Sequence, residues 1–152
     1  MTLTFGLNTI HDLFGKLQRD AEALNDEVTR DNFFNFVVTG YSLIDWVKND
    51  PTVPAAAKTD IAVQDLYNNK WLKICGNLAN ASKHFKLTSR APVTSSATNS
   101  QGYGIGRYGK GGYGVGEESI EIQLSDGQAF DCLELVQGVL NSWQAFFATH
   151  GI

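Results

Sequence analysis

The 152-residue chain has few cysteines, no long apolar run and no excess of basic residues. Its two cysteines, Cys75 and Cys132, lack neighbouring Cys or His residues at metal-ligand spacing. We therefore expect buried, reduced thiols, with neither a disulfide framework nor a metal site. The N-terminus lacks the charged start and apolar run of a signal peptide, and no window reaches the roughly 18 apolar residues of a membrane span. We expect a cytoplasmic protein that makes no contact with a membrane.

The charged residues give a net charge of -4, from 12 Lys and Arg against 16 Asp and Glu. Nucleic acids and anionic membranes are bound through clustered Lys and Arg, so this balance argues against a broad surface for either. What the chain does contain is apolar material, with 43% hydrophobic and 11% aromatic residues. That is enough for the core of one domain at this length, and we expect residues 1–152 to form a single domain.

In the first half of the chain, apolar residues recur every three or four positions, as in amphipathic helices. This period predicts helices over residues 7–24, from Thr29 or Asp31 to Lys48, over roughly 55–67 and over about 70–85. The second of these is apolar around more than half its circumference, so it should be central. In the fourth, the core stripe is expected to comprise Trp71, Ile74, Cys75, Leu78, Ala81 and Phe85. Residues 1–87 are therefore predicted to be a helical bundle.

The character of the chain changes after residue 87. Residues 88–118 form an excursion, rich in Ser and Thr and then in Gly and Tyr, and residues 119–124 alternate as a half-buried strand. Ser125-Asp126-Gly127 is a turn signal, and Asp131 with Glu134 resembles a capping box within a returning helix over 129–149. The strand needs a partner, either residues 93–98 or the Gly/Tyr residues. The predicted fold is mainly α: a bundle of four to five helices, with a Gly/Tyr-rich insertion and a short β element before the last helix.

Residues 102–116, here called the Gly/Tyr segment, contain three consecutive pentads of the form x-Tyr-Gly-x-Gly. Glycine permits turns and close backbone approach, while each tyrosine supplies a large flat anchor. The segment could be a cover packed on its own helices, a contact surface for a second subunit or a protein partner, or a loop without function. As a contact surface, its candidate partner-binding residues are Tyr103, Arg107, Tyr108, Lys110 and Tyr113.

The same glycines match two nucleotide-binding patterns, G-x-G-x-x-G at Gly104–Gly109 and the first seven positions of G-x-x-x-x-G-K-[ST] at Gly104–Lys110. Neither match has the strand and helix that make such a loop a phosphate site, and Gly111 stands where Ser or Thr would bind Mg²⁺. We therefore expect no cofactor. The tyrosines beside Arg107 and Lys110 also fit stacking of single-stranded nucleic acid, but Glu117 and Glu118 dilute that positive charge.

A polar stripe lies beside the core face of the fourth predicted helix. Its members, spaced by three or four residues, are Lys73, Asn77, Asn80 and His84. If the second and fourth helices are neighbours, Asp45 could orient His84 for general acid/base work, with the other three binding an anion or a ribose. The other interpretation is that these side chains are structural or solvated groups on the helix surface.

The run from Asn77 to His84, NLANASKH, and the segment YSLIDW at residues 41–46 resemble segments of small uncharacterised bacterial helical proteins. They are also similar to the HEPN helical-bundle superfamily, many members of which are ribonucleases in toxin and defence systems. The catalytic signature of that family is an Arg and a His with four to six residues between them. His84 would occupy the histidine place, but Asn77 stands at the outer Arg spacing and no arginine occurs between Lys73 and His84.

These observations lead to two hypotheses from different classes. The first is a non-enzymatic module, within a bacterial defence or mobile-element system, that self-associates as a homo-oligomer or binds a protein partner through the Gly/Tyr segment. The alternative, implied by the resemblance, is a HEPN-like RNA-binding protein or ribonuclease that uses Lys73, Asn77, Asn80, His84 and Asp45.

Overall fold

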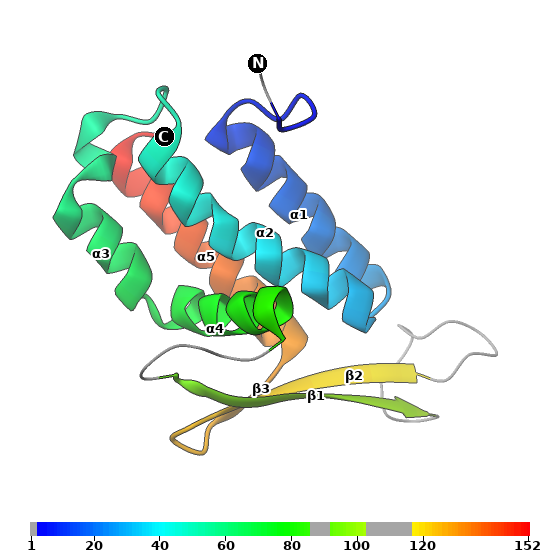
Figure 1. Ribbon diagram of the computed structural model, residues 1–152. Coiled ribbons are helices and arrows are strands. Elements are labelled where there is room, and N and C mark those ends of the chain that lie inside the picture. Colours follow the sequence, from blue (N-terminus) through cyan, green and yellow to red (C-terminus); the bar gives the residue numbers. More distant parts are fainter. Residues whose placement is uncertain (1–2, 86–91, 103–116) are drawn as a thin grey trace.

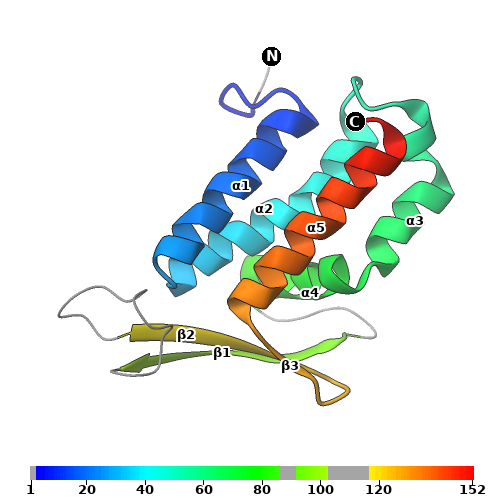
Figure 2. The same ribbon diagram turned by 180° about the vertical axis from the view of Figure 1, so that it is seen from behind.

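The computed structural model describes residues 3–85, 92–102 and 117–152 (Figure 1). Within these ranges, five α-helices lie on one side of a small three-stranded antiparallel sheet, and the view from behind shows the same two layers (Figure 2). The predicted fold class, a mainly α bundle with a short β element before the last helix, is confirmed.

The elements follow the order of the chain. They are α1 (Ile10–Asp26), α2 (Arg30–Asn49), the 3-10 helix η1 (Ala55–Lys58), α3 (Asp60–Asn68), α4 (Lys70–His84), β1 (Thr94–Gly102), β2 (Glu117–Leu124), β3 (Ala129–Asp131) and α5 (Cys132–His150). Each α-helix begins after a residue whose side chain accepts a hydrogen bond from a backbone N–H of the first turn; these residues are Thr9, Thr29, Thr59, Asn69 and Asp131. Such caps satisfy donors that have no partner inside the helix, and they fix where each helix starts.

Several predicted boundaries differ from the structure. The third predicted helix is divided, because the Thr59 side chain caps a new helix. The last helix begins at Cys132 rather than at 129, because Ala129–Asp131 pair with β2. Phe85, expected on the core stripe of α4, is instead fully exposed in the left-handed conformation that ends the helix. The first helix begins at Ile10, three residues later than expected.

The sheet has the order β1-β2-β3, with antiparallel neighbours. Pairing of β1 with β2 runs from Thr94↔Leu124 to Gly102↔Glu117, with one irregularity between Thr94 and Ser96. Of the two partners considered for the predicted strand, the Ser/Thr-rich segment is therefore confirmed. The predicted turn is also present: Gly127 has φ +92°, and its N–H donates to the Leu124 carbonyl at 3.1 Å.

The core forms around α2, as its apolar circumference predicts. At Gly40 a Cβ atom would lie 3.1 Å from Cys75 Sγ of α4, 3.3 Å from Val139 of α5 and 3.5 Å from Leu17 of α1. The Gly40 carbonyl also accepts a hydrogen bond of 3.1 Å from the buried Trp143 indole. Gly40 thus permits three helices to approach α2 at one level.

A second close contact joins α4 to α5 above the sheet. The Trp71 ring lies against Gly138, where a Cβ atom would fall 2.2 Å from the indole. On the sheet side, Trp71 contacts Phe130 of β3 with 5.0 Å between ring centroids. Because the bundle and the sheet share this indole, a side chain at position 138 would disturb both layers.

We predict that Gly138→Ala destabilises the protein by about 1–3 kcal/mol, the usual cost of overpacking, because the indole base cannot move aside without shifting α4. Gly15→Ala is the matched control, since its Cβ would meet only the end of Arg19 at 3.4 Å. That substitution removes a glycine from a helix interior and should be neutral or stabilise by up to about 1 kcal/mol. Urea unfolding measures both, and equal stabilities of the two variants would contradict the role given to Gly138.

Candidate functional site

The polar stripe expected on α4 divides into one buried residue and three accessible ones. Asn77 is buried, and its Oδ1 accepts hydrogen bonds from the backbone N–H groups of Val93 at 2.9 Å and Thr94 at 3.2 Å. These bonds attach the start of β1 to the middle of α4. Asn77 is thus a structural link between the helical layer and the sheet, with its acceptor oxygen occupied.

The other three members of the stripe do not converge on Asn77. Lys73 and His84 are exposed and Asn80 is half-buried, and none of the three side chains makes a hydrogen bond with another described residue. His84 is the last residue of α4. This part of α4 is therefore an accessible surface, with Lys73 at one end of the stripe and His84 at the other.

Asp45 makes its contacts with residues outside the α4 stripe. Its Oδ1 lies 2.9 Å from Lys48 Nζ, and Lys48 also donates to the Tyr67 hydroxyl at 2.9 Å. The bond to Tyr67, followed by the bond to Asp45, raises the pKa of Lys48, which stays charged at neutral pH. Although α2 and α4 are neighbours, the structure shows no hydrogen bond or ion pair between Asp45 and His84 in the part of the chain it describes.

Tyr41 packs between α2 and α4 beside this stripe. Its ring lies on Gly76, so that a Cβ atom there would be 2.4 Å from Tyr41 Cε1. Burial, helped by the nearby Tyr67 and Asp45, raises the pKa of the Tyr41 hydroxyl. Tyr41 therefore acts as a neutral packing group between the two helices.

The candidate partner-binding residues of the Gly/Tyr segment, which are Tyr103, Arg107, Tyr108, Lys110 and Tyr113, lie outside the described residues. The structure describes the two strand ends that flank these residues, the end of β1 and the start of β2. Gly102 and Glu117 are register partners at the end of the β1–β2 ladder. The segment therefore begins and ends at the same end of a two-stranded ribbon.

The cysteines are structural, as expected. Both are buried, and burial raises the pKa of the Cys75 thiol to about 12. The Cys75 Sγ donates to the Val37 carbonyl at 3.2 Å, which adds a polar contact between α4 and α2. Within residues 3–85, 92–102 and 117–152, no group of three or more His, Cys, Asp or Glu side chains could hold a metal ion.

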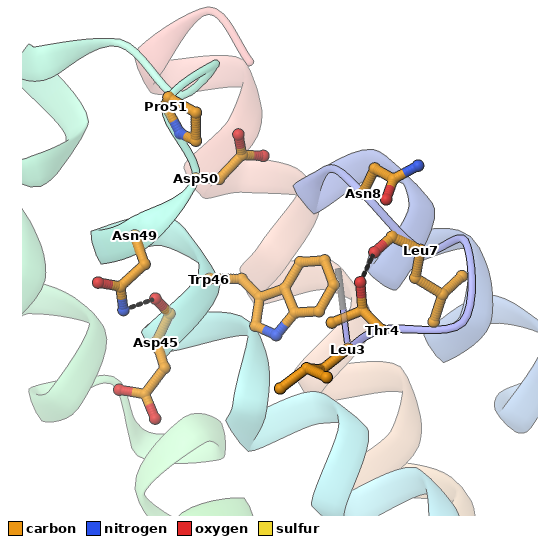
Figure 3. A pocket seen from close by; sticks show the side chains of 9 residues that line it. All are labelled: Leu3, Thr4, Leu7, Asn8, Asp45, Trp46, Asn49, Asp50 and Pro51. Atoms are coloured by element: carbon orange, nitrogen blue, oxygen red, sulfur yellow. Dashed lines mark hydrogen bonds between the residues drawn. The ribbon is translucent and has the colours of Figure 1, made fainter. Parts of the chain in front are cut away.

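The residues before α1 form a pocket with the end of α2 that the sequence did not indicate. In Figure 3 the Trp46 indole lies beside Leu3 and Thr4, while the Asp45 carboxylate points away from them. The pocket has a volume of about 370 Å³. The Thr4 hydroxyl donates to the Leu7 carbonyl, and the Leu7 N–H returns a bond of 2.9 Å to the Thr4 carbonyl. This local turn positions the segment over Trp46.

An apolar groove of about 330 Å³ shares Leu3, Thr4, Leu7 and Trp46 with this pocket. Three large apolar side chains at this groove are accessible: Leu3 at 79%, Phe5 at 100% and Phe34 at 48% exposure. The polar side chains Lys16 and Thr39, which line the groove, are hydrogen-bonded. Lys16 Nζ donates to Asp20 at 2.7 Å and to Thr39 Oγ1 at 2.9 Å. The groove therefore offers an apolar contact surface, and the charge of Lys16 is compensated by Asp20.

Asp50 closes the upper end of the pocket in Figure 3 and joins α2 to α1. Its Oδ2 accepts from the Ile10 N–H at 2.7 Å, and its Oδ1 accepts from the Thr52 N–H at 2.8 Å. Burial opposes ionisation of this carboxyl, but the hydrogen bonds from Thr52 and Ile10 outweigh it and hold its pKa below the ordinary 3.8. The carboxylate is therefore a structural clamp between the two helices.

In the ranges that the structure describes, no helix has the length and apolar character needed to cross a membrane. Comparisons of the chain with protein-family models, with curated proteins and with solved structures gave no match. A function for the chain is therefore inferred from its own geometry.

We predict that Asp50→Asn lowers the free energy of unfolding at pH 7 by about 1–3 kcal/mol, because the amide that replaces one carboxylate oxygen cannot accept both sets of bonds. A lowered pKa in the folded protein means that the Asp50 carboxylate stabilises the fold above pH 3.8 and that this contribution is lost as the pH falls through the folded value. The variant should therefore lose less stability than the wild type between pH 7 and pH 3.

Urea unfolding at both pH values measures this difference. Asp45→Asn on the same helix is the control, since the Asp45 side chain is 72% exposed and its removal should change stability by no more than about 0.5 kcal/mol. Parallel pH dependences for the wild type and Asp50→Asn would contradict the clamp.

Proposed function

We propose that the chain is a non-catalytic interaction module that self-associates or binds a protein partner through the Gly/Tyr segment. The observation that carries this proposal is the length of the β1–β2 pairing. After the irregularity at its start, the ladder is regular from Ser96↔Gln123 to Gly102↔Glu117. The segment is thus carried at the end of a paired ribbon, where its two ends are held about 5 Å apart.

A second line of support is that two of the polar residues that a catalytic function would need are engaged in other contacts. The Asn77 acceptor holds the start of β1, and Asp45 pairs with Lys48. Catalytic groups act in concert only when they lie within hydrogen-bond reach of one another or of a shared substrate. A binding function does not require these polar side chains to lie close together. It requires only that the rest of the protein folds stably and carries the Gly/Tyr segment.

The test is a variant in which Asn-Gly replaces residues 103–116, so that Gly102 and Glu117 stay paired across a two-residue hairpin turn. We expect the far-UV circular dichroism to show a folded bundle, while the mass by light scattering falls or capture of a partner is lost. A full-length control that carries Tyr103→Ser, Tyr108→Ser and Tyr113→Ser should show the same loss if the tyrosines are the anchors. Unchanged mass and unchanged partner capture in both variants would contradict the proposal.

The HEPN-like resemblance carries a second proposal, RNA binding or cleavage through α4. Its support is that Lys73 and His84 are exposed and therefore accessible to a large substrate. Under this alternative His84 is the proton-transfer group, Asn80 and Lys73 contact the RNA, and Asn77 and Asp45 support α4 and α2.

This alternative predicts that the wild type degrades RNA and that His84→Ala reduces the rate at least about 100-fold, as expected when a general acid or base is removed. Lys83→Ala is the control, because Lys83 is an exposed neighbour outside the stripe. The measurement is cleavage of a labelled single-stranded RNA at matched protein concentrations. An inactive wild type, or equal rates for the wild type and His84→Ala, would eliminate ribonuclease activity through His84.

A further inference from the structure

The strand β1 lies at the edge of the sheet. The strand order is β1-β2-β3, so one side of β1 pairs with β2, and no described residue forms a ladder with its other side. An edge strand presents a row of backbone N–H and C=O groups that can pair with another strand.

The sequence of β1 lacks the usual protection of an edge. Its nine residues, TSSATNSQG, include no charged residue and no proline. The one irregularity lies at its start, between Thr94 and Ser96. Natural sheets discourage pairing with other chains by short edges, charged side chains, prolines and bulges, and from Ser96 onward β1 has none of these.

Beyond its start, which Asn77 of α4 holds, β1 is not covered by the helices. Ile120 and Ile122 of β2 are buried in the core, whereas their register partners Asn99 and Ala97 are exposed on the same face of the sheet. At these positions the helical layer therefore ends above β2, and this part of β1 projects beyond it. A second molecule could approach this edge without meeting the helices.

We propose that β1 pairs antiparallel with β1 of a second copy of this chain across a two-fold axis, forming one six-stranded sheet. This inference rests on the proposed function in its self-association form and names the surface and the partner. It does not require residues 103–116 to make the contact. The other edge is less suited, because β3 has only three residues and Asp131 at its end is the cap of α5.

The distribution of charge fits a second copy as the occupant, because the strand that it would bring to the edge, β1, is uncharged. The neighbouring strand β2 carries Glu117, Glu118 and Glu121, and the chain has a net charge of -4, so copies would repel where acidic strands meet. In the proposed sheet two uncharged β1 strands meet, and the two β2 strands stand three strand spacings apart, about 14 Å. This exceeds the Debye length of about 8 Å at physiological ionic strength, so the repulsion is largely screened.

The symmetry of this pairing also limits its size. Each copy uses the β1 edge of the described sheet, and the new sheet ends on both sides in the short β3. An isologous contact of this kind closes after two subunits, so the product is a dimer and not a filament.

The first test places lysines on the edge, with Thr98→Lys and Ser100→Lys in one variant. Both side chains are exposed, so circular dichroism should show an unchanged fold, while like charges across the dyad should weaken dimerisation at least about tenfold. Gln18→Lys with Asn25→Lys adds the same charge at exposed positions of α1 and should leave the dimer intact. Sedimentation at several concentrations measures both variants and the wild type.

The second test is a scan of single cysteines at positions 96 to 100, with Gln18→Cys as the control. The native Cys75 and Cys132 are buried, so mild oxidation reports the introduced thiol. An axis perpendicular to the sheet brings one residue opposite its own copy, with Cβ atoms about 5 Å apart, while other positions are too distant for a disulfide. We expect one dominant cross-linked position in β1 and none at position 18.

These outcomes separate the inference from the proposed function. A wild type that stays monomeric, or a dimer that resists the β1 lysines and shows no dominant cross-link, overturns the β1 pairing. If replacement of residues 103–116 by Asn-Gly leaves the dimer intact while the β1 lysines dissociate it, the β1 pairing stands and the Gly/Tyr contact fails as the basis of self-association. If only that replacement dissociates the dimer, the proposed function stands and the β1 pairing is overturned.

Discussion

The close packing of helices around Gly40 is the constraint on which the rest of the structure depends. Because Gly40 lacks a side chain, Cys75, Val139 and Leu17 can approach α2 from three helices at one level. Trp143 uses the same level to bond the Gly40 carbonyl. The position of α4 is fixed there, and α4 in turn holds β1 through Asn77 and contacts β3 through Trp71. The sheet is thus placed by a contact in the middle of the bundle.

The buried polar residues join elements that are distant in the chain. Asp50 connects the end of α2 to the start of α1, and Asn77 connects α4 to β1. Thr39 of α2 accepts from Lys16 of α1 at 2.9 Å. A buried polar group is stable only when it is hydrogen-bonded, so each of these residues also specifies which elements lie together. Among the candidate catalytic residues, Asn77 has this structural role.

Local signals in the sequence were sufficient to predict most helix ends and the turn at Gly127. The Thr29 cap, the Asp131–Glu134 capping box and the turn at Gly127 follow from contacts within a few residues, which a single sequence displays. The period of the apolar residues also identified α2 as central, because a helix buried on several sides needs apolar residues around its circumference. The fold class could be predicted for these reasons.

Features that depend on distant contacts could not be predicted. The three residues of β3 are too few to show alternation, and they become a strand only because β2 lies beside them. The helical period placed Asn77 on a polar stripe, but its hydrogen-bond partners lie sixteen and seventeen residues away in the sequence. The groove at Leu3, Phe5 and Phe34 joins residues from two separate segments and has no period that would reveal it. In each case the missing information was tertiary.

The end of the helical layer above β2 has an evolutionary consequence. From Ser95 to Ser100, β1 contributes no buried side chain to the core, although its backbone completes the ladder with β2. Selection for folding stability therefore acts there mainly on strand propensity and little on side-chain shape. The binding specificity of this edge can diverge between related sequences while the core of the protein stays the same.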